Sequence, residues 1–149
     1  LSPDVNNLGD SKSLKLQPAM KLKAKLNLVK TVKAGATVGY GASAIVTHDT
    51  KLGVVAIGYA DGIPRNANSS AGVWVAGKRA PLIGRVSMDQ FVVDLGATSL
   101  AKTGDEVIVF GNGNQNEYTV DEWAKACGTI NYEIVTRIGP RVPRIYTRE

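Results

Sequence analysis

Two short stretches place phenolic and charged side chains where apolar strands are expected to end. One is "GYADGIPR" at 58–65, and the other is "GRVSMDQ" at 84–90. Their candidate residues are Tyr59, Asp61, Arg65, Arg85, Met88 and Asp89. Either stretch alone fits a polar surface turn. Together they predict a site, because a scaffold of strands holds such groups rigidly at its strand ends.

A third candidate is Tyr40, a bulky side chain between Gly39 and Gly41 in "GYGASA" at 39–44. The glycine spacing superficially matches a dinucleotide-binding loop. Such a loop needs a helix whose N-terminus meets the pyrophosphate, and "IVTHD" at 45–49 does not start a helix, so we exclude it. Two interpretations remain: a packed tyrosine between turn glycines, or a tyrosine that the glycines bring close to a ligand.

One histidine and one cysteine limit the other chemistry that the chain can perform. His48 stands beside Asp49 in an expected turn, which favours an exposed histidine over a Ser-His-Asp site. Cys127 falls on the apolar side of an expected helix and is predicted to be a core thiol rather than a nucleophile. We expect no metal site, no disulfide framework and a reducing compartment.

Length and composition predict one domain with a β-rich fold. The chain has 149 residues, of which 44% are hydrophobic, and its 16 glycines and six prolines separate short aliphatic runs. Its apolar stretches are shorter than the about 20 residues of a membrane span, and no signal-peptide pattern opens the chain. We expect a soluble, cytoplasmic protein without a membrane partner.

The net charge of +5 is spread along the chain. Over 21–33, lysines alternate with aliphatic residues, which favours the solvated face of a strand over a phosphate-binding patch. Nucleic-acid binders interleave basic residues with exposed aromatics, and this segment has no aromatic residue. We therefore expect no nucleic-acid partner, and keep a stand-alone basic β-barrel that binds RNA or DNA as an alternative.

The candidate residues need elements to position them, and the apolar pattern predicts seven or eight short strands. Strands are expected at 21–32, 37–46, 52–60, 90–96 and 105–111, with a hairpin over 72–86 turning at Gly77–Lys78. Thr119 and Glu122 form a capping-box pattern for a helix that ends at Gly128, and a second short helix is an option at 131–137. The fold expected is mainly β: a closed or nearly closed β-barrel with one or two short helices near the C-terminus.

Several multi-residue motifs occur in one order along the chain. They are "VGYGAS", "IGYADGIPR", "IGRVSMDQFVVDLG", "GDEVIVFG" and "TINYEIVTRIGPRVPRIY". Over about residues 18–147 they closely resemble the C-terminal β-domain of bacterial alanine racemase, and ordered motifs are more specific than one glycine pattern. The resemblance implies that 18–149 form this domain and that 1–17 are an extended lead-in from an N-terminal (β/α)8 barrel that this chain lacks.

The resemblance implies an isomerase that interconverts L- and D-alanine and supplies D-alanine for peptidoglycan. The family's enzyme is a head-to-tail homodimer. Its barrel carries pyridoxal 5′-phosphate on a lysine, and the C-terminal domain of one subunit completes the active site of the other. The Schiff-base lysine therefore lies outside this chain, and the chain alone is expected to be inactive.

Matching positions imply roles for individual residues. Racemisation removes the α-proton from one face of the substrate and returns a proton to the other, so two groups are needed. Tyr40 matches the tyrosine base that faces the cofactor lysine, and Gly39 and Gly41 are expected to let its backbone approach the cofactor. Met88 matches a residue whose backbone N–H holds the substrate carboxylate. Positions that line the substrate entryway are matched by Tyr59, Arg65, Arg85 and Asp89.

One departure from the family pattern concerns Pro140. Many members have a tyrosine before "RVPR" that reaches the cofactor phosphate and narrows the entry. Proline lacks that hydroxyl, so we expect the phosphate contact to be lost or replaced and the inner gate to be wider. This keeps open a broader-specificity or serine racemase of the same fold.

Overall fold

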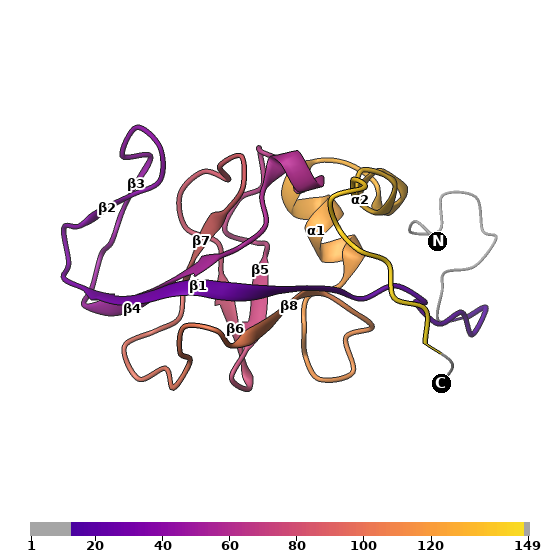
Figure 1. The fold of residues 1–149 in the computed structure, drawn as a ribbon, viewed down its shortest axis with the longest axis horizontal. Coiled ribbons are helices and arrows are strands. Elements are labelled where there is room, and N and C mark those ends of the chain that lie inside the picture. The colour runs from indigo at the N-terminus through magenta and orange to yellow at the C-terminus, as the bar shows by residue number, and fades with distance from the viewer. Residues whose placement is uncertain (1–12, 148–149) are drawn as a thin grey trace.

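A six-stranded antiparallel sheet forms the body of the molecule (Figure 1). The structure, a computed structural model, describes residues 13–147, so most of the predicted lead-in at 1–17 lies outside the described residues. The strands of this sheet are β1 (Leu22–Val32), β4 (Thr50–Val55), β5 (Gly72–Val75), β6 (Lys78–Pro81), β7 (Phe91–Asp94) and β8 (Glu106–Phe110). Their spatial order is β6-β5-β8-β1-β4-β7.

The two edges of the sheet approach each other, so that it nearly closes on itself. Leu82, directly after β6, bridges to Val93 in β7, and the Ile83 N–H donates to the Val92 carbonyl at 2.9 Å. Closure satisfies edge groups that would otherwise be open to pairing with other chains. The predicted mainly β, nearly closed barrel is confirmed.

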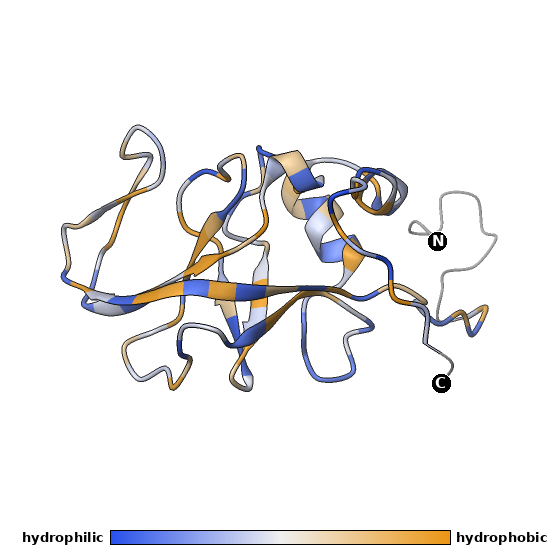
Figure 2. Ribbon diagram, viewed as in Figure 1, coloured by the Kyte–Doolittle hydropathy of each residue, from blue (hydrophilic) through white to orange (hydrophobic). Residues whose placement is uncertain are grey.

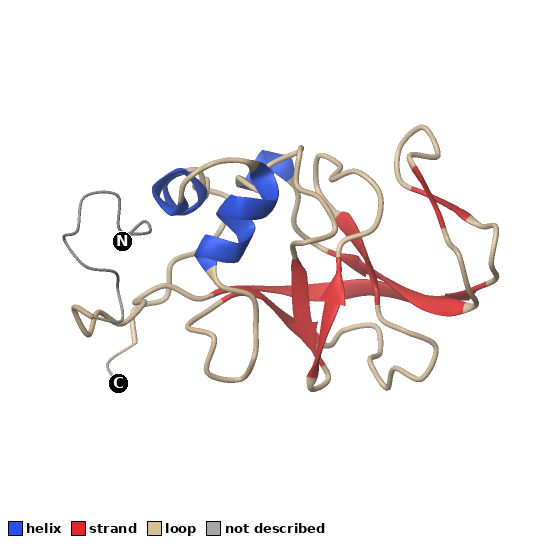
Figure 3. Cartoon of the chain, turned by 180° about the vertical axis from the view of Figure 1, so that it is seen from behind, coloured by secondary structure: helices blue, strands red, loops and turns tan. Residues whose placement is uncertain are grey.

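Two short helices cover one end of the barrel, where the prediction put them (Figure 3). They are α1 (Val120–Cys127) and α2 (Asn131–Thr136). The predicted capping box forms between Thr119 and Glu122, and Gly128 ends α1 with a φ of 68°. Among the residues described, no helix is long and apolar enough to cross a membrane.

The core joins these helices to the barrel. Trp123 of α1 is fully buried and meets Phe91 of β7 edge to face, with ring centroids 5.9 Å apart. Its indole N–H donates to the Val109 carbonyl of β8 at 2.7 Å, so the one polar atom of the ring is satisfied. The helix and the barrel are therefore held by one shared cluster of apolar side chains.

A buried carboxylate organises the loop between β8 and α1. Glu117 is fully buried, and its Oε2 accepts from the Gln115 N–H at 2.8 Å. Burial raises the pKa of this carboxyl, but the backbone N–H groups of Glu117, Gln115 and Gly113 and the charge of Lys21 lower it more, so the net pKa lies below its usual value. The loop is built around an ionised side chain.

The lysines of β1 are exposed, as the alternating pattern predicted. Hydrophilic and hydrophobic residues alternate along the β1 ribbon (Figure 2). The alternation fails at one place: Leu26 pairs with Val55 and Leu28 with Val54, which leaves Asn27 as an extra residue in β1. Because a bulge shifts the following side chains to the other face, Leu28 is 49% exposed and not buried.

The predicted strand over 37–46 is wrong. This segment is a hairpin of two short strands, β2 (Thr37–Val38) and β3 (Ala44–Ile45), that projects from the barrel at the end opposite the helices (Figures 1 and 3). Three of the four residues at 39–42 have positive φ: Gly39 at 80°, Gly41 at 70° and Ala42 at 52°. Such angles are incompatible with an extended strand.

Two other boundaries also differ from the prediction. The β5–β6 turn is at Ala76–Gly77 rather than Gly77–Lys78, because both residues have positive φ and Val75 pairs with Lys78. The strand predicted over 52–60 ends at Val55, and a single 3-10 turn, η1 (Tyr59–Asp61), follows it. Of 56–60 only Ile57 and Gly58 are buried, and the backbone N–H groups of Tyr59 and Ala60 bond to the loop at 87–88 rather than to a strand.

Candidate active site

Tyr40 lies in the turn of the β2–β3 hairpin and faces solvent. Its side chain is 81% exposed, and its hydroxyl has no hydrogen-bond partner among residues 13–147. The turn is closed by the Ala42 N–H, which donates to the Gly39 carbonyl at 3.1 Å. The phenol is thus presented to solvent by a tight turn.

Glycine is favoured at the two positions beside Tyr40 for different physical reasons. A Cβ on Gly39 would lie 2.9 Å from Ser43 Oγ and 3.1 Å from the Arg85 nitrogen, so Gly39 is needed for close contact inside the chain. A Cβ on Gly41 would meet nothing within 4 Å, so its positive φ is what favours glycine there. The hairpin is further tied by the Arg85 N–H, which donates to Ser43 Oγ at 3.2 Å.

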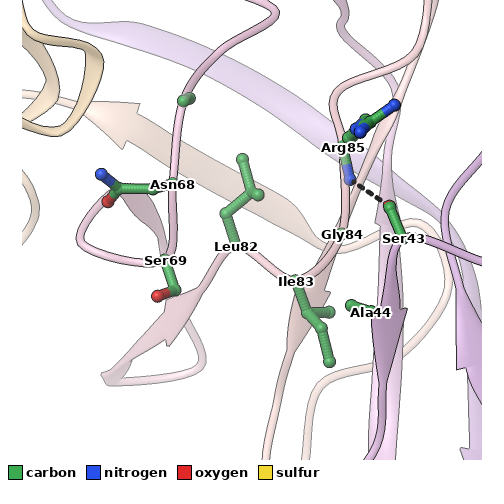
Figure 4. A pocket seen from close by; sticks show the side chains of 9 residues that line it. Ser43, Ala44, Asn68, Ser69, Leu82, Ile83, Gly84 and Arg85 are labelled. Atoms are coloured by element: carbon green, nitrogen blue, oxygen red, sulfur yellow. Dashed lines mark hydrogen bonds between the residues drawn. The ribbon is translucent and has the colours of Figure 1, made fainter.

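A groove of about 480 Å³ lies beside this hairpin (Figure 4). Ser43 and Ala44 line one side, Asn68 and Ser69 the other, and residues 82–85 form the floor between them. Its size falls in the range of small-molecule sites. Apart from Arg85, sequence reasoning identified none of the residues that line this groove. They are small polar or apolar residues from three separate segments, and no sequence pattern connects them.

The two stretches that the sequence singled out lie side by side. The Tyr59 N–H donates to the Ser87 carbonyl at 3.1 Å, and the Ala60 N–H donates to the Met88 carbonyl at 2.9 Å. A Cβ on Gly58 would collide with both of these carbonyl oxygens, so glycine permits the approach. Segment 84–88 therefore touches the Tyr40 hairpin at one end and the Tyr59 turn at the other.

Asp61 and Arg141 complete this region. Asp61 was among the sequence candidates but was given no role in the site, and Arg141 was not a candidate. Asp61 is buried, and its Oδ2 accepts from the Gly58 N–H at 2.9 Å. Arg141 Nε lies 3.2 Å from Asp61 Oδ1, and Nη2 donates to Asp89 Oδ1 at 2.7 Å. The hydrogen bond to Asp89 and the charges of both carboxylates raise the pKa of Arg141 above its usual value. The opposite charges of these side chains were the only signal in the sequence that they could pair. The sequence alone does not show that positions 61, 89 and 141 lie close together.

The remaining predicted residues are open to solvent. Tyr59 is 42% exposed and Met88 is 53% exposed, and the Met88 N–H has no acceptor in the described part of the chain. Arg65 is exposed in the β4–β5 loop and makes no side-chain ion pair with residues 13–147. The structure brings Tyr59, Met88 and Asp89 together, and it leaves Arg65 as a free cation in a neighbouring loop.

Pro140 is exposed at the second position of a turn. The Val142 N–H closes this turn on the Gly139 carbonyl at 3.3 Å, and the Gly139 N–H donates to the Asp61 carbonyl at 2.9 Å. Proline suits the second position because its φ is already set for the turn and its missing N–H is not needed there. The C-terminal segment is thereby directed past Asp61.

His48 and Cys127 lie where the sequence placed them, one in an exposed turn and one in the core. The His48 side chain is 61% exposed and lies 3.6 Å from Asp94, which confirms an exposed turn histidine. Cys127 is buried in α1, and burial raises the pKa of its thiol to about 11, so it stays protonated at neutral pH.

Comparisons with known proteins give one consistent family. Residues 19–146 match the family described as "Alanine racemase, C-terminal domain". A protein named "Alanine racemase" from Streptomyces coelicolor is 50% identical over 148 residues, which are 99% of this chain and 37% of that protein. The chain spans little more than a third of such relatives.

Solved structures agree with the sequence comparison. The alanine racemase of Streptomyces coelicolor superposes with a TM-score of 0.89 at 51% identity, over 95% of this chain and 37% of that one. The alanine racemase of Bacillus anthracis, described with bound L-Ala-P, gives 0.85 at 38% identity, over 99% of this chain and 37% of that one.

Proposed function

The chain belongs to the alanine racemase C-terminal domain family, and we propose that it forms that domain in an enzyme that interconverts L- and D-alanine. The enzyme is pyridoxal-phosphate-dependent, and this domain, residues 18–149, follows a cofactor-bearing (β/α)8 barrel. It works in the cytoplasm and supplies D-alanine for peptidoglycan. The observation that carries the proposal is Tyr40: a phenol that is 81% exposed, has no hydrogen-bond partner within residues 13–147, and stands between two glycines of positive φ in the turn of a hairpin.

The chemistry of alanine inversion explains the need for such a phenol. When bound, pyridoxal phosphate withdraws electrons from the substrate's α-carbon and so makes its proton removable. Tyr40 Oη accepts or returns the proton on one face, and the cofactor lysine outside this chain serves the other. A base must come within hydrogen-bond reach of its proton, which a side chain packed into its own domain cannot do.

The described residues fit a cofactor that another domain holds. The Tyr40 hydroxyl and the Met88 N–H lack partners within residues 13–147. The hairpin that carries Tyr40 approaches the segment that carries Met88, because Gly39 packs against the Arg85 backbone. The Met88 N–H holds the substrate carboxylate in this proposal. The backbone fixes that donor, because the Ser87 carbonyl, which shares a planar peptide group with the Met88 N–H, accepts from the Tyr59 N–H at 3.1 Å.

The substrate entryway consists of side chains that surround these two groups. We assign it to Tyr59, Arg65, Arg85 and Asp89. Both arginines are exposed, so they are free to attract a carboxylate and steer a small zwitterion inward. The relative from Bacillus anthracis, with its bound L-Ala-P, supports a site for alanine-sized molecules in this family.

A mixing experiment tests the proposed head-to-tail homodimer. One variant of the full-length enzyme carries Tyr40→Phe, and the other lacks the cofactor lysine. If this domain completes the partner's site, a mixed dimer has one intact site, and random 1:1 exchange restores about a quarter of wild-type activity. If each subunit builds its own site, the mixture stays inactive, and the proposal of a shared site fails.

Two controls accompany the mixing experiment. The 149-residue chain with added pyridoxal phosphate is expected to show no racemisation of L-alanine above the free-cofactor background. Turnover well above that background would contradict the assignment of the cofactor lysine to another domain. Arg65→Ala and Arg85→Ala in the full-length enzyme are expected to disturb KM and specificity while the cofactor's absorbance is kept.

A serine or broader-specificity racemase is the second candidate, because Pro140 replaces the tyrosine expected at the inner gate. Comparing kcat/KM for alanine and serine distinguishes the two. The nucleic-acid alternative has little support: Lys23 and Lys33 of the basic segment pair with Glu106 at 2.9 Å and Asp49 at 2.7 Å, and the family match accounts for most of the chain. If the protein binds no labelled oligonucleotide at either low or high salt, the nucleic-acid alternative is excluded.

A further inference from the structure

Three charged side chains link the entryway loops to the C-terminal segment. Arg141 stands between Asp61, in η1, and Asp89, in the loop before β7. Arg141 follows Asp89 by 52 positions and Asp61 by 80 positions in the sequence. One guanidinium therefore connects three segments that meet only in the folded chain.

Asp61 gives this link a fixed base. Its Oδ2 is held by the Gly58 N–H, its carbonyl is held by the Gly139 N–H, and only 11% of its side chain is exposed. A planar guanidinium that pairs with so constrained a carboxylate has little freedom of its own. Arg141 therefore transmits the position of the buried η1 turn outward to Asp89.

Stability does not account for the outer of the two ion pairs. The side chains of Arg141 and Asp89 are 55% and 52% exposed, and ion pairs at such exposure contribute little to folding. The pair does, however, hold the Asp89 side chain against Arg141, with Arg141 Nη2 2.7 Å from Asp89 Oδ1. Met88, whose N–H has no acceptor among the described residues, directly precedes Asp89, so a displacement of the Asp89 backbone also displaces that N–H.

We propose that Arg141 is a positioning residue: it holds the Asp89 side of the entryway at a set distance from the Tyr59 turn and so limits the size of the substrate side chain. The inference rests on the proposed racemase function. Pro140 assists it, because its turn presents Arg141 to both carboxylates. The residue that departs from the family's tyrosine thus supports the arginine that sets the opening.

The test uses the full-length holoenzyme with Arg141→Gln, the conservative Arg141→Lys and a matched control, Arg137→Gln. Arg137 is also an exposed arginine of the C-terminal region, paired with Glu133 at 2.9 Å on α2, and it contacts no entryway side chain. The measurements are kcat and KM for L-alanine and L-serine, and hydrogen exchange of the Tyr59 and Ala60 amides. Circular dichroism checks that each variant is folded.

Arg141→Gln is expected to raise KM for alanine about tenfold and to leave kcat within about twofold of the wild type. This is the pattern expected when a mutation removes an interaction that stabilises the bound substrate and the transition state equally. The serine-to-alanine ratio of kcat/KM is expected to rise about tenfold, the scale of one small group in a pocket. The amides of 59 and 60 exchange faster. Arg141→Lys recovers part of each effect, and Arg137→Gln matches the wild type.

The proposal is overturned if Arg141→Gln leaves KM, the serine-to-alanine ratio and amide exchange unchanged, or if Arg137→Gln changes them equally. If Arg141→Gln fails to fold, Asp89→Asn replaces it, because this variant removes only the outer ion pair. The proposal then requires smaller changes of the same sign in KM, the serine-to-alanine ratio and amide exchange. A wild-type enzyme that does not racemise alanine refutes the proposed function, while amide exchange still decides whether Arg141 fixes the two loops.

Discussion

Replacing Tyr40 with phenylalanine in the full-length enzyme separates a catalytic tyrosine from a packed one. The change keeps the ring and removes only the hydroxyl. Because that hydroxyl has no partner among the described residues and the side chain is 81% exposed, the unfolding free energy should change by no more than about 0.5 kcal/mol. Losing a general base slows catalysis by about 10² to 10⁴, or ~2.7 to 5.4 kcal/mol in barrier height. The two effects differ enough to be measured separately.

The defect should also depend on the enantiomer. With the cofactor lysine intact, the variant still removes the proton from the face that the lysine serves. It should therefore exchange the α-proton of D-alanine with solvent deuterium and exchange that of L-alanine much more slowly. The assay is NMR of the α-proton signal in D₂O with each enantiomer, alongside thermal unfolding of wild type and variant.

Two results would refute the reasoning. Equal slowing of both exchanges would mean that Tyr40 serves neither face selectively. A large loss of stability without a selective kinetic defect would mean that the ring and hydroxyl are structural. Tyr132→Phe, at a half-exposed tyrosine of α2, is the matched control and should change neither quantity.

Three further predictions concern the hairpin, the helix and the buried carboxylate. Gly39→Ala should destabilise the hairpin by about 2 kcal/mol and lower kcat, since its Cβ would press on Ser43 and its φ is positive, whereas Gly41→Ala should cost only about 1 kcal/mol in chemical denaturation. The Cys127 thiol should react slowly with a disulfide reagent at pH 8. Because its folded pKa is raised from 9.0 to about 11, the stability it contributes is present below pH 9 and is lost as the pH rises toward 11, and Cys127→Ala should abolish that loss. Glu117→Gln should cost about 1 to 3 kcal/mol at pH 7. Because the folded pKa of Glu117 is lowered, wild type should lose this advantage as the pH falls below 4.5, and equal stability of both proteins at pH 7 would contradict the argument.

Local patterns in the sequence determined the elements whose causes are local. The Thr119–Glu122 capping box and Gly128 gave both ends of α1, because caps are read within one turn of chain. Alternating lysines and aliphatics gave β1, since side chains on a strand alternate between faces. The ordered motifs identified the family before any geometry was known, and they pointed to Tyr40.

The errors arose where backbone angles outweighed side-chain pattern. "TVGYGASAIV" looks like a strand because its apolar residues are β-formers, but the positive φ at Gly39, Gly41 and Ala42 turns it into a hairpin. The bulge at Asn27 exposes Leu28 through a register shift that depends on the partner strand. Neither feature has a local signal strong enough to override periodicity.

The site itself was decided by tertiary contacts. The sequence supplied Tyr59, Met88 and Asp89 as candidates, but only close backbone approach at Gly58 explains why their loops meet. Asp61 became buried, and Arg141 came to lie between two carboxylates, because the chain returns to η1 after α2. Pairings between residues this distant in sequence follow from barrel closure and helix packing, which depend on contacts throughout the core. Residue types alone therefore identify the charged groups but do not predict which of them form ion pairs.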